Sequence, residues 1–294
     1  MKIKLLFLIL IFGSWHLSNA QDDLLDILDK ELEPTDTYTA ATFKMTRIAI
    51  GHSIETRKKG ILEIVTTNRF WNTPTERSQS FVADRLTSRI ALEYGISDRL
   101  STGLGGTTWD GLFDGYLKYK LLRQKEGGGS PLSITLFQNT SYNSNAFPQA
   151  PNSFSDRLSF TSQLLIGKKI SSDFSVQLAP TFIHRGNLSA GGPEKNHFAL
   201  GLGARFKLTP HLSLVSEYYY RANPITSFDN YAPFAIGVNW ELGDIMLQFN
   251  LTNAQRIVED AFITQTRYNF NFKNPNLNFG FNATYVIHFK RHLK

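Results

Sequence analysis

The stretch His197–Arg221, HFALGLGARFKLTPHLSLVSEYYYR, decides the fold class of this 294-residue chain. Every even-numbered residue from Phe198 to Leu208 is apolar, whereas basic residues lie at odd positions. The alternation resumes after Thr209-Pro210-His211. A period of two indicates strands with one apolar face, and the break indicates a tight turn. Each strand has ten to twelve residues, which suits the roughly nine to eleven that a tilted strand needs to cross a bilayer.

The composition agrees with strands that cross a membrane. Thirteen per cent of the residues are aromatic, with 23 Phe and 11 Tyr, yet the mean hydropathy is slightly negative. No apolar run after Phe12 approaches the roughly eighteen residues of a membrane helix. In a barrel only every second residue meets lipid, so a chain can be polar on average and still span the bilayer.

The same alternation recurs along the chain and predicts a single antiparallel transmembrane β-barrel of about 12 strands, occupying residues 61–294. The predicted strands are Ile61–Phe70, Arg85–Tyr94, Leu100–Thr108, Gly111–Leu122, Leu132–Tyr142, Arg157–Lys168, Phe174–His184, His197–Leu208, Leu212–Arg221, Phe234–Leu242, Ile245–Thr252 and Leu277–Phe289. A barrel of 14 strands, with Thr42–Ile54 and Phe262–Phe272 added, is the alternative.

Short turns alternate with long polar connections, and this orients the barrel. Tight turns lie at GISDRLS, KISSDFS and KLTPHLS, whereas the connections at 71–84, 143–156, 185–196, 222–232 and 253–276 are long. In outer-membrane barrels the short turns face the periplasm and the long loops face outward. An even set of strands then leaves both chain ends in the periplasm.

The N-terminus predicts export. Lys2 and Lys4 precede the apolar run Leu5–Phe12, and Ser18-Asn19-Ala20 offers small residues before Gln21. This is the pattern of a signal peptide cleaved after residue 20. The chain has no cysteine, which excludes disulfides, thiolate catalysis and a lipid anchor on cysteine. We therefore expect a protein of the outer membrane of a diderm bacterium.

Charge is unevenly distributed along the chain. The stretch from Asp22 to Asp36 holds seven acidic residues and one lysine, whereas the rest of the mature chain holds 28 basic and 18 acidic residues. Residues 21–60 are therefore expected to lie in the periplasm or to plug the lumen, where an acidic segment can dock on a basic interior. A solvated leader with one weak amphipathic helix is the alternative.

If the apolar parity of each strand faces lipid, the other parity lines the lumen. The predicted lumen-lining charged residues are Arg69, Arg85, Arg89, Glu93, Asp114, Lys118, Lys120, Arg157, Arg205, Lys207, Glu217, Arg221 and Glu241. Basic residues outnumber acidic ones, so a water-filled lumen would favour anionic solutes. The alternative is that these charges pair across strands and serve the structure alone.

Catalytic patterns are absent from the sequence. The histidines show no HExxH or other metal spacing, and no GxSxG motif occurs. We predict no catalytic residue, no metal and no cofactor. His184, beside Arg185 at a strand end, would be the leading candidate if the protein were a lipid hydrolase. An exported protein is not expected to bind nucleic acid.

Several segments resemble one family of outer-membrane barrel proteins of diderm bacteria, known as a domain of unknown function. They include LEYGISDRLSTGLG, DGYLKYKLLRQ, QLAPTFIHR, GLGARFKLTPHLSLVSEYYYR, LQFNLTN and LNFGFNATYVIHF. The resemblance runs roughly from Phe43 to Phe289, and it implies the fold and the location but no activity. The chain departs from the family pattern at Asn68, where a His is expected, and at Lys290–Lys294, which extend past the last aromatic residue.

These observations favour porin-like passage or uptake of small solutes, anionic solutes among them. The alternatives are a lipid-modifying enzyme of the outer membrane and a structural or adhesive protein acting through its long loops. Expected partners are outer-membrane lipids and the barrel-assembly machinery, which would recognise the C-terminal strand Leu277–Phe289. The sequence does not identify the solute.

Overall fold

The computed structural model describes residues 38–39, 41–72, 83–127, 129–146, 153–186, 195–271, 273 and 276–289. The predicted signal peptide and residues 21–37 lie outside this part of the chain. The described strands are β1 (Ile61–Trp71), β2 (Arg85–Gly95), β3 (Leu100–Thr107), β4 (Leu112–Leu122), β5 (Ser133–Asn143), β6 (Leu158–Lys169), β7 (Phe174–Arg185), β8 (Asn196–Lys207), β9 (Leu212–Arg221), β10 (Phe234–Leu242), β11 (Ile245–Thr252) and β12 (Asn278–His288).

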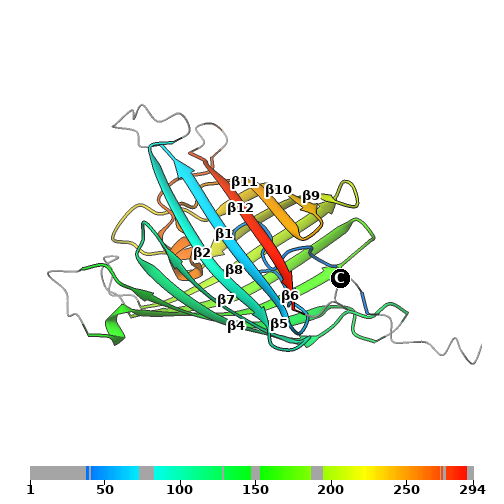
Figure 1. The fold of residues 1–294 in the computed structure, drawn as a ribbon. Coiled ribbons are helices and arrows are strands. Elements are labelled where there is room, and N and C mark those ends of the chain that lie inside the picture. The colour runs from blue at the N-terminus through cyan, green and yellow to red at the C-terminus, as the bar shows by residue number, and fades with distance from the viewer. Residues whose placement is uncertain are drawn as a thin grey trace, which may run out of the picture.

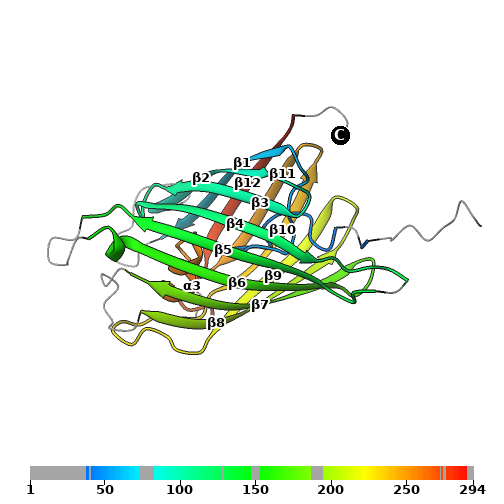
Figure 2. The ribbon, with the colours of Figure 1, turned by 90° about the horizontal axis from the view of Figure 1, so that it is seen from below.

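These strands form one closed antiparallel barrel (Figures 1 and 2). Each strand pairs with its neighbours in sequence, and β1 closes the ring against β12, from Ile61 opposite His288 to Phe70 opposite Phe279. The predicted barrel of twelve strands is confirmed. The alternative of fourteen is wrong, because residues 42–54 add no strand to the wall and the stretch expected at 262–272 begins within a helix, α3 (Glu259–Gln265).

The barrel is apolar outside and polar inside. In β8 the side chain of Phe198 is 54% exposed, whereas those of His197 and Arg205 are 3% and 2% exposed. β9 continues the pattern, with Leu214 outside and Glu217 buried. A barrel in water would have polar residues outside and apolar residues inside. The outer face of this barrel is therefore suited to contact with the hydrocarbon of a membrane. The described residues include no helix that is both long and apolar enough to cross a membrane.

The two ends of the barrel differ. We call the end with the connections after β2, β4, β6, β8 and β10 the turn end, and the opposite end the loop end. The described chain enters at the turn end, where Tyr38 bridges to Lys125 and the N–H of Gly60 donates to Gly95. The segment that joins β11 to β12 and contains α3 belongs to the loop end.

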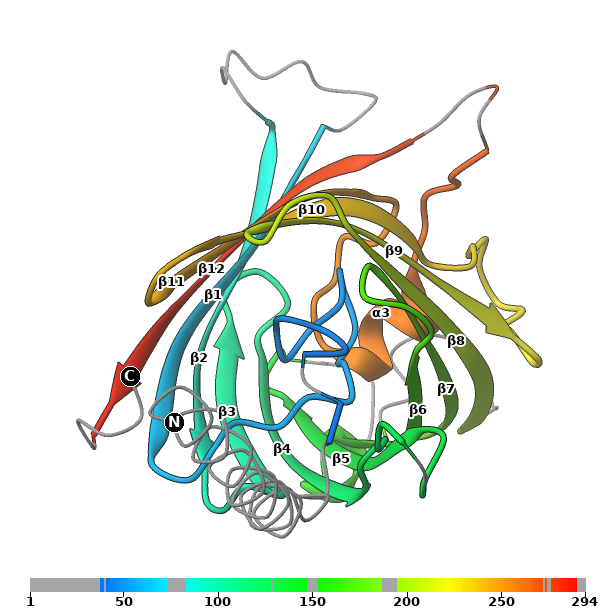
Figure 3. The same cartoon turned by 90° about the vertical axis from the view of Figure 1, so that its right-hand side faces the viewer.

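Two pieces of chain occupy the interior. Residues 41–57, which we call the inner segment, and helix α3 both lie inside the ring of strands (Figure 3). They contribute Phe43, Ile48, Ile54 and Phe262 to one apolar cluster, which the wall completes with residues such as Phe137 and Tyr219. The barrel therefore has a packed core, which the wall forms together with two segments that are not part of it.

Candidate functional site

The structure places eight of the thirteen predicted lumen residues in the buried interior. They are Arg69, Arg89, Glu93, Asp114, Lys118, Lys120, Arg205 and Glu217. The other five lie near strand ends: Arg157, Lys207, Arg221 and Glu241 are half-buried, and Arg85 is exposed. The buried charged residues therefore lie mainly in the middle of the strands, and those near strand ends are more exposed.

Several of these charges are paired. Arg89 donates from Nε to Asp114 Oδ1 at 2.7 Å and from a terminal nitrogen to Oδ2 at 2.6 Å, a bidentate pair with both side chains fully buried. Lys120 pairs with Glu55 of the inner segment, and Glu241 pairs with Lys44. The two-pronged geometry of arginine makes the Arg89–Asp114 bond strong, which fixes β2 relative to β4.

Glu217 on β9 receives the tip of the inner segment. Its Oε2 accepts hydrogen bonds from the backbone N–H groups of Ala49, Ile50 and Gly51, at 3.0, 2.8 and 3.0 Å. The hydroxyl of Tyr219 donates to the other oxygen at 3.0 Å. A carboxylate bound by several donors is a stable buried anion, so Glu217 anchors the tip of the inner segment.

Lys118 on β4 holds the two arms of the inner segment together. Its ammonium donates to the carbonyls of Thr46, Ser53 and Glu55 at 3.0, 3.1 and 3.1 Å. The arms also bond to each other, through Ser53 N–H to the Thr46 carbonyl at 2.9 Å. All three protons of the ammonium are used, so this lysine is a structural anchor in the closed lumen.

Neutral side chains of the wall complete the binding of the inner segment. Gln177 accepts from Ile54 N–H and donates to the His52 carbonyl, each at 2.8 Å. Thr135 donates to the Ile54 carbonyl at 2.8 Å. These contacts satisfy the polar backbone of an irregular segment that water does not reach. The alternating strand pattern places Gln177 inside but does not indicate its partner.

Helix α3 contacts both the inner segment and the wall. Arg47 donates to Glu259 at 2.8 Å, and His52 Nε2 lies 3.6 Å from the same oxygen of Glu259. On the wall side, Ser141 donates to Asp260 at 2.8 Å and Arg185 donates to Thr264 at 2.6 Å. The two segments that fill the lumen are thus linked near its centre. Sequence reasoning missed Arg47 and Glu259, because both lie outside the strands.

Inward-facing glycines make room for the inner segment. A Cβ atom at Gly203 on β8 would lie 2.4 Å from the side chain of Ile48, and one at Gly167 on β6 would lie 2.7 Å from that of Ile54. At these distances even a methyl group would require the side chains of Ile48 and Ile54 to move. Glycine at an inward strand position often marks a close approach of other chain, so these glycines were an available sequence signal that the prediction did not use.

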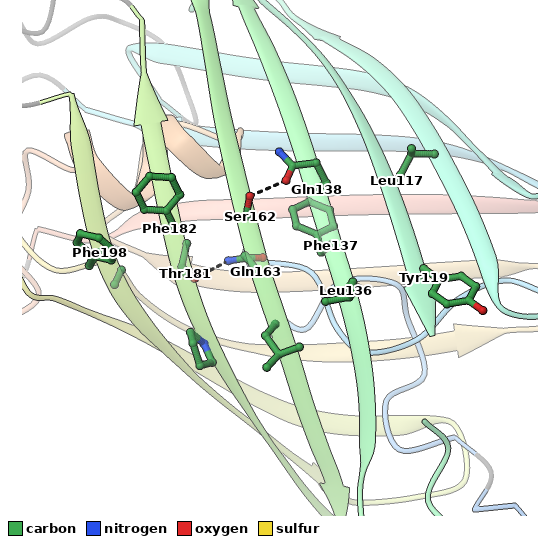
Figure 4. Close-up of a pocket in the computed structure, with 13 residues that line it drawn as sticks. Leu117, Tyr119, Leu136, Phe137, Gln138, Ser162, Gln163, Thr181, Phe182 and Phe198 are labelled. Atoms are coloured by element: carbon green, nitrogen blue, oxygen red, sulfur yellow. Dashed lines mark hydrogen bonds between the residues drawn. The ribbon is translucent and has the colours of Figure 1, made fainter. Parts of the chain in front are cut away.

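The outer wall carries an apolar groove of about 610 Å³ over β4 to β8 (Figure 4). Leu117, Leu136 and Phe182 line it, and Ser162 donates to Gln138 at 2.5 Å. The pairing of β6 with β7 is interrupted between the pair Gln163–Thr181 and the pair Ile166–Leu178. Pro180 lies within this interruption. Because the groove lies on the apolar outer face, we assign it to membrane contact rather than to a solute.

The described residues show no catalytic arrangement at His184. Its Nδ1 lies 2.7 Å from Asn196 Oδ1, and its ring packs 6.5 Å from that of Phe160. The described residues also hold no cluster of three or more His, Asp or Glu side chains that would bind a metal. The lumen, with its charged wall and its inner segment, is therefore the candidate functional site.

Solved structures with a similar chain path are barrels of bacterial outer membranes. The KdgM porin is 10% identical with a TM-score of 0.48, over 78% of this chain and 99% of that one. An outer membrane channel from Pseudomonas putida F1 is 16% identical with a TM-score of 0.43, over 79% and 97%. The outer membrane phospholipase A from Escherichia coli is 8% identical with a TM-score of 0.41, over 77% and 92%.

No curated protein matches this sequence. A family model does match, over residues 43–287, and this range includes most of the inner segment and all but the last residue of the barrel wall. The match covers well over half of the chain, in agreement with the closed barrel and its apolar outer face. The chain belongs to the family of the membrane bound beta barrel domain, DUF5777.

Proposed function

We propose that this protein is an outer-membrane channel for small anionic solutes, exported by a cleaved signal peptide and closed by its inner segment. The apolar outer face and the family support a membrane barrel. The wall supports the solute class, because the buried charged residues on the strands are six basic and four acidic: Arg69, Arg89, Lys118, Lys120, Arg185 and Arg205 against Glu63, Glu93, Asp114 and Glu217. A positive lining favours anions.

One observation carries the proposal: the inner segment, which occupies the lumen together with helix α3, is not part of the barrel wall. Tyr38 and Gly60, on either side of the inner segment, both bond at the turn end. A segment that enters and leaves by the same end can withdraw without threading through the barrel. A wall with buried Arg, Lys and Glu side chains would then surround a polar path, as a channel requires.

Conductance of the barrel in planar bilayers tests this function. We expect the full chain to conduct rarely and a variant lacking residues 22–57 to conduct steadily, because the deletion removes the inner segment and leaves the described wall intact. Circular dichroism confirms that both proteins keep their strands. If neither conducts while both are folded, the channel function is wrong.

A single substitution tests whether the inner segment closes the channel without deleting any part of the chain. Glu217→Gln removes the charge that accepts three backbone N–H groups, and bonds to charged groups contribute about 1.5–3 kcal/mol each. We expect more frequent openings than in the wild type. Asp229→Asn, which removes a charge from an exposed residue at the loop end, is the matched control and should leave the openings unchanged.

A lipid-modifying activity would be located at His184, on the outer face beside Asn196. Hydrolysis would need a nucleophile next to this histidine, and the described residues place no hydroxyl in hydrogen-bond contact with it. Comparison of His184→Ala with the wild type on phospholipid micelles tests the activity. Equal hydrolysis rates, or none, would rule out this site. For assembly, we propose that β12 is the strand recognised by the barrel-assembly machinery.

A further inference from the structure

A second cavity, separate from the inner segment, opens at the loop end. It has a volume of about 620 Å³ and is bounded by Trp71 and Arg85 from the wall, Trp109 from the β3–β4 turn, and Arg256, Arg267 and Tyr268 from the segment around α3. This volume is typical of a small-ligand pocket. The cavity thus lies where a solute would arrive before it reached the filled part of the lumen.

The pocket faces the mouth of the barrel and not the lipid. Trp71 and Arg85 are partners across the β1–β2 pair, on the parity that carries the buried residues Arg69 and Arg89. Side chains of this parity point away from the membrane. We therefore favour a dissolved solute over a lipid headgroup as the occupant.

The aromatic part of the pocket is formed by two tryptophans in contact, one buried and one partly exposed. The indole of Trp71 is buried at 4% exposure and meets Trp109 edge-on, with 5.0 Å between ring centroids. Trp109 is 45% exposed, and the guanidinium of Arg256 lies 5.5 Å from its ring centre. A supported, exposed indole offers an apolar platform for the face of a ring.

The basic part of the pocket has spare positive charge. Arg256 is paired with Asp110 at 2.8 Å. Arg85 and Arg267 form no ion pair within the described residues, and both are exposed. Arg267 is held by stacking over Phe228, at 5.0 Å. Guanidinium groups that are free of carboxylate partners bind carboxylates in a bidentate way.

Two amide side chains extend the polar lining. Gln255 and Gln265 border the cavity, and neither amide has a hydrogen-bond partner among the residues that the structure describes. A primary amide both donates and accepts, as does a hydroxyl. The pocket thus combines a ring platform, free arginines and groups that match hydroxyls.

We propose that this pocket binds an acidic saccharide, with the apolar face of a sugar ring on Trp109 and its carboxylate on Arg85 and Arg267. This rests on the proposed function, because the pocket would concentrate the solute at the channel mouth. Neither the aromatic platform alone nor the positive charge alone would distinguish an acidic saccharide from other ligands. A flat aromatic anion would use both but would leave the two amides unpaired, which disfavours it.

Calorimetric titration of the full chain in detergent micelles tests the site without any requirement for conduction. The probes are trigalacturonate, the neutral maltotriose, and 2-naphthoate, a flat aromatic anion without hydroxyls. We expect trigalacturonate to bind at least about tenfold more tightly than maltotriose, since a lost charged hydrogen bond corresponds to about one decade in affinity. It should also bind more tightly than 2-naphthoate, which leaves the two amides unpaired.

Variants locate the binding. Arg267→Gln and Trp109→Ala should each weaken trigalacturonate binding about tenfold. Arg99→Gln removes the same charge from an exposed residue of a β2–β3 turn at the other end and should bind like the wild type. Circular dichroism checks the fold of each variant. Equal binding of trigalacturonate and maltotriose, preference for 2-naphthoate, or wild-type affinity in both pocket variants would overturn the proposal.

The two hypotheses fail separately. A closed barrel that never conducts can still bind trigalacturonate at its mouth, which would reject the channel and keep the site. A deletion variant that conducts without any saccharide binding would keep the channel and reject the site.

Discussion

At the scale of the residue, the interior depends on charges that have defined partners. The sequence placed Arg89 and Asp114 on the inward parity, and this was sufficient to locate them. Their bidentate bond also needs the register of β2, β3 and β4, which sets Arg89 opposite Thr107 and Asp114 opposite Gly105. Strand register arises from the whole sheet, so the alternation of one strand does not predict the pair.

Asp114→Asn tests how strongly the wall depends on this pair. The substitution leaves the fully buried guanidinium of Arg89 without its counter-charge, and breaking a buried pair on one side costs about 3–5 kcal/mol. We expect urea unfolding in micelles to shift to lower concentration. Asp229→Asn is the exposed control and should unfold with the wild type; an equal shift for both would contradict a specific role of the pair.

Asp110 predicts a pH dependence at the loop end. This turn residue is 3% exposed, and burial, opposed by Arg256 and reinforced by Asp260, raises the pKa of its carboxyl to about 6. Because the folded state holds the proton more tightly than the unfolded state, the stability from Asp110 is fully present below its ordinary pKa of about 4. It is lost as pH rises through about 6, and the total change is about 3 kcal/mol.

Unfolding of Asp110→Asn beside the wild type measures this dependence. The asparagine does not titrate, so the stability of the wild type relative to the variant should fall between about pH 4 and pH 6 and be level above about pH 7. A difference that stays constant over this range would show that Asp110 does not carry the effect.

At the scale of the element, the twelve strands were predictable. A lumenal plug within residues 21–60 was one of the expected alternatives, but the form of the inner segment and helix α3 were not predicted. Thr42–Ile54 carries apolar residues at strand-like spacing and was a candidate strand. In the structure its backbone bonds to side chains of the wall, such as Glu217 and Lys118, instead of to a neighbouring strand. Side-chain donors and acceptors from distant strands outweigh the local pattern here, and no local sequence signal identifies them.

The segment around α3 shows the same limit. A long polar loop was expected at residues 253–276, and the structure folds part of it into a helix inside the barrel. The acidic residues Glu259 and Asp260 lie in the first turn of this helix, where the helix dipole favours them. The apolar residues Phe262 and Ile263 that follow were the available signal for burial.

Gly203→Leu tests whether the close fit of the inner segment keeps the lumen closed. A Cβ at this position would approach the terminal methyl of Ile48 to 2.4 Å, so a leucine requires the side chain of Ile48 to move, which we expect to loosen the tip of the inner segment. We expect faster trypsin cleavage after Lys44 or Arg47. Ala204→Leu adds the same bulk on the outer face of the same strand, and unchanged cleavage there would exclude a general loosening of β8.

At the scale of the whole molecule, parity identified charged residues of the strands that face inward, and topology decides what they contact. Inward positions of the strands could be assigned from period two alone. The occupancy of the lumen depends on how chain outside the wall folds back, which involves contacts more than a hundred residues apart, as between Ile50 and Glu217. Such contacts follow from the closed barrel and not from any one segment.

The last prediction concerns the charge of the wall once the inner segment is removed and helix α3 remains inside. Without residues 22–57, the strands keep six buried basic and four buried acidic residues, and Lys118 and Lys120 lose the carbonyls and the Glu55 carboxylate that now bind them. The reversal potential of the deletion variant in a potassium chloride gradient should therefore indicate a preference for chloride. The preference should weaken at high salt, because ions screen the wall.

Two variants in the same deletion background locate this preference for chloride. Lys120→Gln should reduce the preference, whereas Arg99→Gln, outside the lumen at the turn end, should not. Cation preference of the deletion variant would show that the acidic residues dominate the path, and it would remove the charge argument for an anionic solute.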